Sequence, residues 1–283
     1  MPDSSALLEV RDLAVSFAGE NGRRVRAVNG VSLSLHAGRT LAIVGESGSG
    51  KSVTALSILR LLPPPPQAIV ERGEVIFEGR DLLKLPARDM LRIRGGGVAM
   101  IFQEPMTSLN PVYTIGEQII EAIRQHHRVL RRAAKEMASA ALREVGIDDP
   151  HVRLHAYPHQ FSGGMRQRVM IAMALACNPR ILLADEPTTA LDVTIASQIL
   201  DLLQRLQRSR GLSIMLITHD LGIVAQRADD VCVMYRGRIV EAGTVKEVLA
   251  RPMHPYTRAL LECRPRVGQR AERLVTIGDR DYG

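Results

Sequence analysis

Gly45-Glu-Ser-Gly-Ser-Gly-Lys-Ser52 is the most informative stretch of the chain, because it has the glycine spacing of a phosphate-binding loop. It follows the apolar run Leu41–Val44 and precedes a helix-forming segment, which is the strand-loop-helix context that such a loop requires. A plain glycine turn is the alternative interpretation, and this context argues against it. The sequence therefore predicts a loop whose backbone N–H groups and helix N-terminus hold phosphates.

The side chains of this loop suit ATP together with Mg²⁺. Lys51 would meet the charges of the β- and γ-phosphates, and the Ser52 hydroxyl would bind Mg²⁺. The residues expected to hold the nucleotide are Gly45, Glu46, Ser47, Gly48, Ser49, Gly50, Lys51 and Ser52.

Four short apolar runs predict the strands of a buried parallel sheet, because helical stretches separate them. They are Leu41–Val44, Val98–Phe102, Ile181–Ala184 and Ser213–Thr218. Residues 7–35 alternate apolar and polar positions around a turn-rich Gly19-Glu-Asn-Gly22, which predicts antiparallel strands. The core is therefore expected to be α/β, with an antiparallel β subdomain.

Helical periodicity dominates the middle of the chain. Ile115–Val129 and Arg131–Val145 carry apolar residues at three- and four-residue spacing, which predicts a helical subdomain inserted at about residues 104–178. Past Val240 the chain is expected to be helical and then basic, with a loosely packed tail.

Asp185 and Glu186 end the apolar run that starts at Ile181. A buried strand with a purely structural role avoids unpaired carboxylates, because their desolvation is costly. Asp185 would bind Mg²⁺, directly or through water, and Glu186 would act as general base on the attacking water. A salt-bridged strand edge is the alternative for such a pair alone, and the preceding phosphate loop argues against it.

The segment Phe161-Ser-Gly-Gly-Met-Arg-Gln-Arg168 is similar to the signature sequence of ABC ATPase domains. The order of motifs from the phosphate loop to His219 resembles that family too, whereas a flexible turn would explain Ser-Gly-Gly alone. The resemblance implies a P-loop ABC ATPase domain over residues 7–245, followed by a short C-terminal extension over residues 246–283.

The same resemblance assigns roles to the signature segment. Ser162, Gly163 and Gly164 would cap a helix running to about Ala176, whose positive end meets the γ-phosphate held by the opposite protomer. Met165 stands where family signatures usually carry Gln.

Four further positions match the family pattern. Gln103 would reach Mg²⁺ or its water and begin the loop that senses the transport domain, and His219 would hydrogen-bond the γ-phosphate. Asp192 would contact the partner protomer, or it would cap the helix that follows. Phe17 would stack on adenine, with an inward-facing strand aromatic as the alternative. Gln103 and His219 taken alone would be a surface amide and a structural histidine.

Two distant segments resemble the importer ATPases for oligopeptides, dipeptides and nickel. They are Ile101-Phe-Gln-Glu-Pro-Met-Thr-Ser-Leu-Asn-Pro111 with Thr114-Ile-Gly116, and His254-Pro-Tyr-Thr257. This resemblance implies two transmembrane permease subunits, a second ATPase subunit that is more often a different chain than a second copy, and an extracytoplasmic solute-binding protein that acts indirectly. Many relatives hold an iron-sulphur cluster in a cysteine-rich C-terminal segment, but this chain has only Cys263 there, so no cluster is expected.

Composition bounds the alternatives. Aromatic residues make up only 3% and Trp is absent, which argues against a nucleic-acid surface built on stacked bases. The charge of +7 suits an anionic membrane surface as well as nucleic acid. With no spanning run, signal peptide or CxxC pair, the chain is expected at the cytoplasmic face of the inner membrane. Rival classes are an ABC ATPase that acts without a permease, on nucleic acid or a cytosolic complex, and a nucleotide-binding module without hydrolysis.

Overall fold

The computed structural model describes residues 6–19, 23–103, 108–189 and 191–262. The chain divides into two compact units. The first unit combines residues 1–84 with residues 215–283, and the second comprises Leu85–Ile214. The boundary between the units falls inside strand β8 (Ser213–Thr218).

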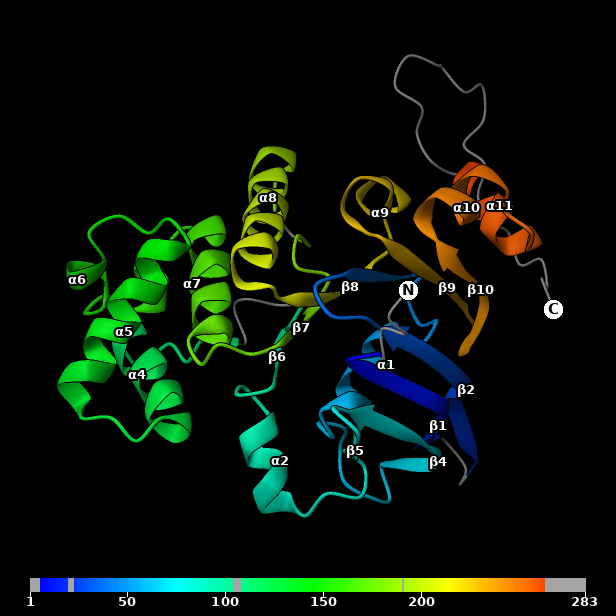
Figure 1. Ribbon diagram of the computed structural model, residues 1–283, viewed down its shortest axis with the longest axis horizontal. Coiled ribbons are helices and arrows are strands. Elements are labelled where there is room, and N and C mark those ends of the chain that lie inside the picture. Colours follow the sequence, from blue (N-terminus) through cyan, green and yellow to red (C-terminus); the bar gives the residue numbers. More distant parts are fainter. Residues whose placement is uncertain (1–5, 20–22, 104–107, 190, 263–283) are drawn as a thin grey trace. The chain divides into compact units, whose positions relative to one another are not determined.

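The first unit begins with a four-stranded antiparallel sheet in the order β2-β1-β4-β5. Figure 1 shows these strands in blue and cyan. Their bounds are β1 (Leu8–Ala18), β2 (Arg24–Leu35), β4 (Ala68–Phe77) and β5 (Arg80–Asp81). The antiparallel entry that the alternation predicted is therefore confirmed, and the turn residues 20–22 lie outside the described residues.

A second sheet in this unit carries the order β10-β9-β3-β8. Strand β3 (Thr40–Val44) is buried at every position, as its apolar run predicted, and it pairs in parallel with β9 (Asp230–Tyr235). The prediction that the chain is helical past Val240 is wrong at its start, because β10 (Arg238–Thr244) still pairs antiparallel with β9.

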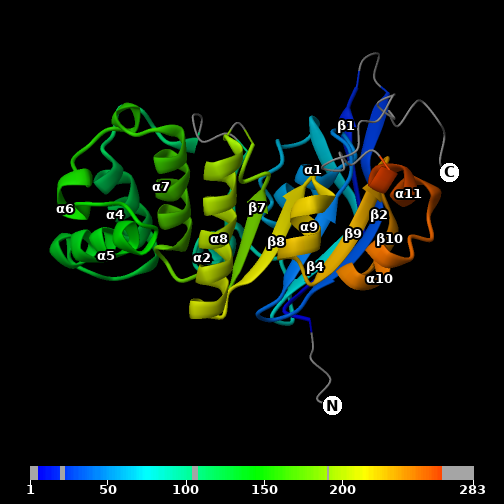
Figure 2. The same ribbon diagram turned by 90° about the horizontal axis from the view of Figure 1, so that it is seen from above.

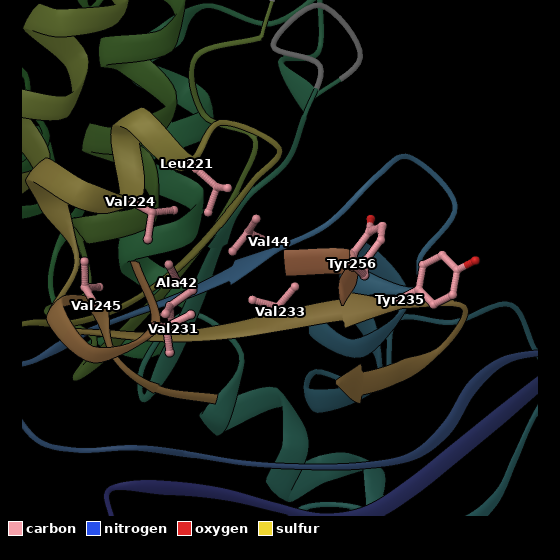
Figure 3. Packing of buried hydrophobic residues seen from close by; sticks show 10 residues of the cluster. Ala42, Val44, Leu221, Val224, Val231, Val233, Tyr235, Val245 and Tyr256 are labelled. Carbon is pink, nitrogen blue, oxygen red and sulfur yellow. The ribbon is translucent and has the colours of Figure 1, made fainter. Parts of the chain in front are cut away.

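Helices α1 (Lys51–Ile58), α9 (Leu221–Arg227), α10 (Val245–Ala250) and α11 (Pro255–Glu262) complete the described part of this unit (Figure 2). Apolar side chains from α9, α10 and α11 form one buried cluster with Val44 of β3 and Val231 and Val233 of β9 (Figure 3). The cluster fixes the C-terminal helices of the unit to the strand that leads into the phosphate loop.

Within its described residues, the second unit holds two parallel strands and more helices than the first unit. Strand β6 (Val98–Ile101) pairs with β7 (Ile181–Asp185), and the strand predicted up to Phe102 ends one residue earlier. The helices are α2 (Ala87–Ile93), α4 (Ile115–His126), α5 (Arg131–Glu144), α6 (Pro150–Arg153), α7 (Gly163–Leu175) and α8 (Val193–Arg210), with a 3₁₀ turn at Pro158–Gln160.

Local capping explains several helix ends in the second unit. Thr114 and Glu117 form a reciprocal capping box at the start of α4. The helix predicted to reach Val129 ends at His126, because His127 is extended and leads toward the start of α5. Helix α8 follows an Asp192 N-cap and ends at Arg210, with Gly211 as its C-cap, whose positive φ of 64° suits a residue without Cβ.

No helix within the described ranges is long and apolar enough to cross a membrane.

Candidate active site

The phosphate-binding loop connects β3 to α1 in the first unit. Two of its glycines lie where a side chain cannot fit. A Cβ at Gly45 would lie 2.1 Å from the Met234 carbonyl oxygen, and a Cβ at Gly50 would lie 2.5 Å from the Ala27 carbonyl oxygen. Gly50 also has a φ of 105°, which L side chains rarely adopt. The loop is therefore wrapped closely by backbone, as the glycine pattern predicted.

Polar groups inside this loop are arranged to meet phosphate. The Lys51 ammonium group is buried and donates to the carbonyl oxygens of Gly45 and Glu46, each at 2.8 Å. In the described part of the loop, the Ser49 hydroxyl is buried with no hydrogen-bond partner. Because an unpaired buried hydroxyl is costly, a phosphate oxygen that accepted from Ser49 would remove this cost.

Two other predicted residues lie in the same unit. His219 follows β8 directly and is exposed, and Asp220 beside it caps α9 through the N–H of Gly222 at 2.6 Å. Phe17 lies near the end of β1, opposite Val25 on one side and Ala68 on the other, and its side chain is half-buried. An imidazole and an aromatic face are thus both accessible to a ligand.

The carboxylate pair lies in the second unit at the end of β7. Asp185 is the last residue of the strand and is buried, and Glu186 follows it with a φ of 45° in the left-handed region. Glu186 Oε2 accepts hydrogen bonds from Thr189 Oγ1 at 2.8 Å and from Gln103 Nε2 at 3.3 Å. The structure thus brings Glu186 and Gln103 together, and it adds Thr189, which the sequence analysis missed.

The signature segment has the geometry expected of an anion-binding helix start. Ser162 caps α7 by accepting from the Met165 N–H at 3.4 Å, and the helix ends at Leu175 with Ala176 as its C-cap. Ser162 and Gly163 are exposed, so the positive end of the helix is open to solvent. A Cβ at Gly164 would lie 2.6 Å from Ile195 Cγ2, so this glycine permits close packing of α7 on α8.

Asp192 caps α8, because its Oδ1 accepts from the Ile195 N–H at 2.9 Å. This is the alternative role that the sequence left open, and the side chain remains exposed. Ala190, just before it, lies outside the described residues, as do residues 104–107 of the importer segment and the tail from Cys263 onward.

The residues expected to bind Mg²⁺ are Ser52, Gln103 and Asp185. They would offer a hydroxyl, an amide and a carboxylate oxygen, which are the hard ligands that Mg²⁺ prefers. The carboxylate of Asp185 is buried at the end of a strand. This position suits a bound cation, because a charged carboxylate is costly in a purely apolar environment.

Comparisons with known proteins identify the family of the chain. A family model described as ABC transporter matches residues 28–189, and one described as the C-terminal region of oligopeptide/dipeptide transporters matches residues 240–282. The oligopeptide transport ATP-binding protein OppD of Bacillus subtilis (strain 168) is 54% identical over 270 residues, which cover 95% of this chain and 75% of OppD. The dipeptide transport ATP-binding protein DppD of the same organism is 53% identical over 271 residues, which cover 96% of this chain and 80% of DppD.

The solved structures show the same fold. The dimeric structure of a post-hydrolysis state of the ATP-binding cassette MJ0796 bound to ADP and phosphate matches with a TM-score of 0.74 and 26% identity. The match covers 84% of this chain and 98% of that one.

The phosphate loop, the carboxylate pair and the signature helix define an ATPase of the ABC class, with the α/β fold that the sequence predicted. The chain belongs to the ABC transporter family, as an ATP-binding subunit of its oligopeptide and dipeptide importers, and it hydrolyses ATP to power transport.

Proposed function

We propose that Glu186 is the general base of ATP hydrolysis in this subunit. The observation that supports this role is its paired hydrogen bonds: Gln103 and Thr189 both donate to Oε2, which orients the carboxylate beside Asp185. A carboxylate held in this way can accept a proton from a water molecule aligned with the γ-phosphate. Gln103 would report on the state of the transport domain through the same contact.

The remaining residues bind and orient. Lys51, Ser49 and the backbone N–H groups of the loop would hold the phosphates, and Phe17 would stack on the adenine ring. His219 would hydrogen-bond the γ-phosphate from its exposed position after β8. Mg²⁺, bound by Ser52, Gln103 and Asp185, would neutralise the charge that develops on the phosphate oxygens.

A complete site would need two protomers. Ser162, Gly163 and Gly164 of one protomer would face the γ-phosphate bound by the other, and Asp192 would contact the partner close by. The MJ0796 cassette is dimeric in its post-hydrolysis state, which supports this arrangement. We expect the partner to be a second, unlike ATPase subunit, and ATP binding would close the dimer while hydrolysis would reopen it.

The permease would dock on the helical subdomain of residues 104–178. A groove of about 390 Å³ lies along α4 and reaches the start of α5, and its lining residues are Tyr113, Glu117, Ile120, Glu121, Arg124, Gln125 and Arg131. Val112 beside it is 71% exposed and Tyr113 is 53% exposed. Apolar side chains exposed beside a groove with charges of both signs suit an amphipathic helix of a permease.

Peptides are the cargo class that the relatives favour over nickel. OppD and DppD are peptide transport proteins by name, and residues 240–282 match the C-terminal region of that group. The cargo would cross through two permease subunits after delivery by an extracytoplasmic binding protein, and this chain would act at the cytoplasmic face of the membrane. The comparisons favour this role over an ABC ATPase without a permease.

The test is to tag the chain in its own host, solubilise the membranes gently and identify the co-purifying proteins by mass spectrometry. The proposal expects two polytopic permeases and a second ATPase. Val112→Glu should reduce recovery of the permeases, whereas Val152→Glu, which changes an equally exposed valine of α6, should not. Recovery of only soluble or nucleic-acid partners would overturn the assignment of a permease partner.

A further inference from the structure

The phenol of Tyr256 contacts the phosphate loop from the C-terminal helix α11. Its ring is fully buried, and its hydroxyl oxygen accepts a hydrogen bond from the backbone N–H of Glu46 at 3.0 Å. We propose that Tyr256 is a positioning residue for the phosphate loop, through which the C-terminal extension sets the affinity of the subunit for nucleotide. This inference rests on the proposed role of the loop in binding phosphate.

Both backbone polar groups of Glu46 are held. Its N–H donates to Tyr256, and its carbonyl oxygen accepts from Lys51 Nζ at 2.8 Å and from the Ser49 N–H at 3.2 Å. Glu46 therefore links the phenol to the two loop residues that are best placed to meet phosphate. A change in the position of Glu46 would move the lysine that neutralises the phosphate charge.

The tyrosine is held rigidly enough to act as a fixed point. Its ring packs against that of Tyr235, with centroids 4.4 Å apart, and Figure 3 shows the two hydroxyl groups pointing in different directions. The start of α11 is anchored separately, because the Glu241 carboxylate accepts from the N–H groups of Met253 at 2.8 Å and His254 at 3.0 Å. Neither anchor uses the phenol oxygen.

The loop is also held from a second direction. The N–H of Gly237, in the turn between β9 and β10, donates to the Ser49 carbonyl oxygen at 2.9 Å. One contact thus fixes Glu46 and the other fixes Ser49. Without the phenol, the first half of the loop would lose one of these two fixed points.

A packing role and a positioning role predict different consequences for the hydroxyl. Packing needs only the ring, which phenylalanine retains. Positioning needs the oxygen, because its removal leaves the Glu46 N–H without its acceptor in a partly buried site. The loop would then populate conformations that do not bind phosphate. The apparent nucleotide affinity would fall in proportion to the fraction of molecules whose loop is still in the binding conformation.

The experiment compares Tyr256→Phe with Tyr235→Phe, which removes the hydroxyl of the paired ring. On the full chain, titrations with fluorescent ATP and ADP should give dissociation constants about three- to tenfold higher for Tyr256→Phe than for the unchanged chain. Those for Tyr235→Phe should equal those of the unchanged chain. In the membrane-assembled transporter, the KM for ATP should rise by the same factor, with kcat within about twofold. A melting curve on each variant measures any loss of packing.

Lys51→Ala separates this inference from the role of the loop. If Lys51→Ala loses nucleotide while Tyr256→Phe binds ATP and ADP like the unchanged chain, Tyr256 has only a packing role and the inference is wrong. If Lys51→Ala itself keeps full affinity, the proposed phosphate site is wrong. Equal weakening by Tyr256→Phe and Tyr235→Phe would also overturn the inference, since the effect would then come from the aromatic pair.

Discussion

Replacing Glu186 with Gln should abolish turnover while leaving ATP bound. Glutamine has nearly the same shape, and the Thr189 hydroxyl, now 2.8 Å from Oε2, can still donate to the amide oxygen. The local structure should therefore persist, and the loss should be chemical. A general base contributes about 10²- to 10⁴-fold, so kcat should fall by that factor, which corresponds to roughly 3–5 kcal/mol of transition-state stabilisation.

The assay for Glu186→Gln is phosphate release by the membrane-assembled transporter at saturating ATP. Binding of ATP to the isolated chain should stay within about twofold, because the loop residues are unchanged. Size-exclusion chromatography of this chain mixed with its partner ATPase subunit and ATP should reveal a trapped dimer. Thr189→Val is the matched control: it removes one hydrogen bond to the Glu186 carboxylate but leaves the carboxylate itself, and it should lower kcat only about three- to tenfold. Turnover by Glu186→Gln within tenfold of the unchanged transporter would refute the assignment of the base.

Three other predictions follow from the packing and the charges. Gly50→Ala should lose nucleotide binding and about 1–3 kcal/mol of stability in urea unfolding, because its Cβ would clash with the Ala27 carbonyl oxygen. Gly79→Ala is the control, because Gly79 also has a positive φ but open space around it, and this variant should still bind nucleotide. Gly164→Ala should lower the melting temperature of the protein, because its Cβ would clash with Ile195. Gly163→Ala, whose Cβ would make an ordinary contact at 3.7 Å, should keep the melting temperature unchanged but lose ATPase activity. Burial disfavours the charged Glu241 carboxylate, but hydrogen bonds from the N–H groups of Met253 and His254 help to outweigh this, and the pKa of Glu241 is lowered. Ionised Glu241 should therefore stabilise the folded protein at pH values above its ordinary pKa of 4.5. This stabilisation should be lost as the pH falls through the lower pKa that Glu241 has in the folded protein. Glu241→Gln should accordingly cost about 1–3 kcal/mol in urea unfolding at pH 7, and the difference should shrink as the pH falls below 4.5.

The sequence predicted what is set by local pattern. The phosphate loop was recognisable because its glycines, lysine and serine are adjacent in the chain and lie between a strand and a helix. The signature helix was predicted to within a residue at its C-terminal end through the resemblance of its segment to ABC ATPase domains. Asp192 could cap α8 or contact a partner, and the structure shows the cap.

Contacts between distant residues were not predictable in this way. The hydrogen bond between Tyr256 and Glu46 joins residues 210 positions apart, and no periodicity of either segment indicates it. Strand β10 was missed because its edge position leaves most of its side chains partly exposed, so its apolar pattern is weak. The contact between Thr189 and Glu186 depends on the turn that begins at Glu186. Glu186 has a positive φ in this turn, and nothing in the sequence predicts a positive φ for a glutamate.

The two fixed points of the phosphate loop have a consequence for biosynthesis. The loop leaves the ribosome early, but Gly237 and Tyr256, which hold it, are translated about 190 to 210 residues later. At typical elongation rates of about 5–20 residues per second, this leaves the loop without its supports for roughly 10–40 s. The nascent chain therefore exposes a phosphate loop without these two supports, and a full-affinity site forms only when synthesis is nearly complete.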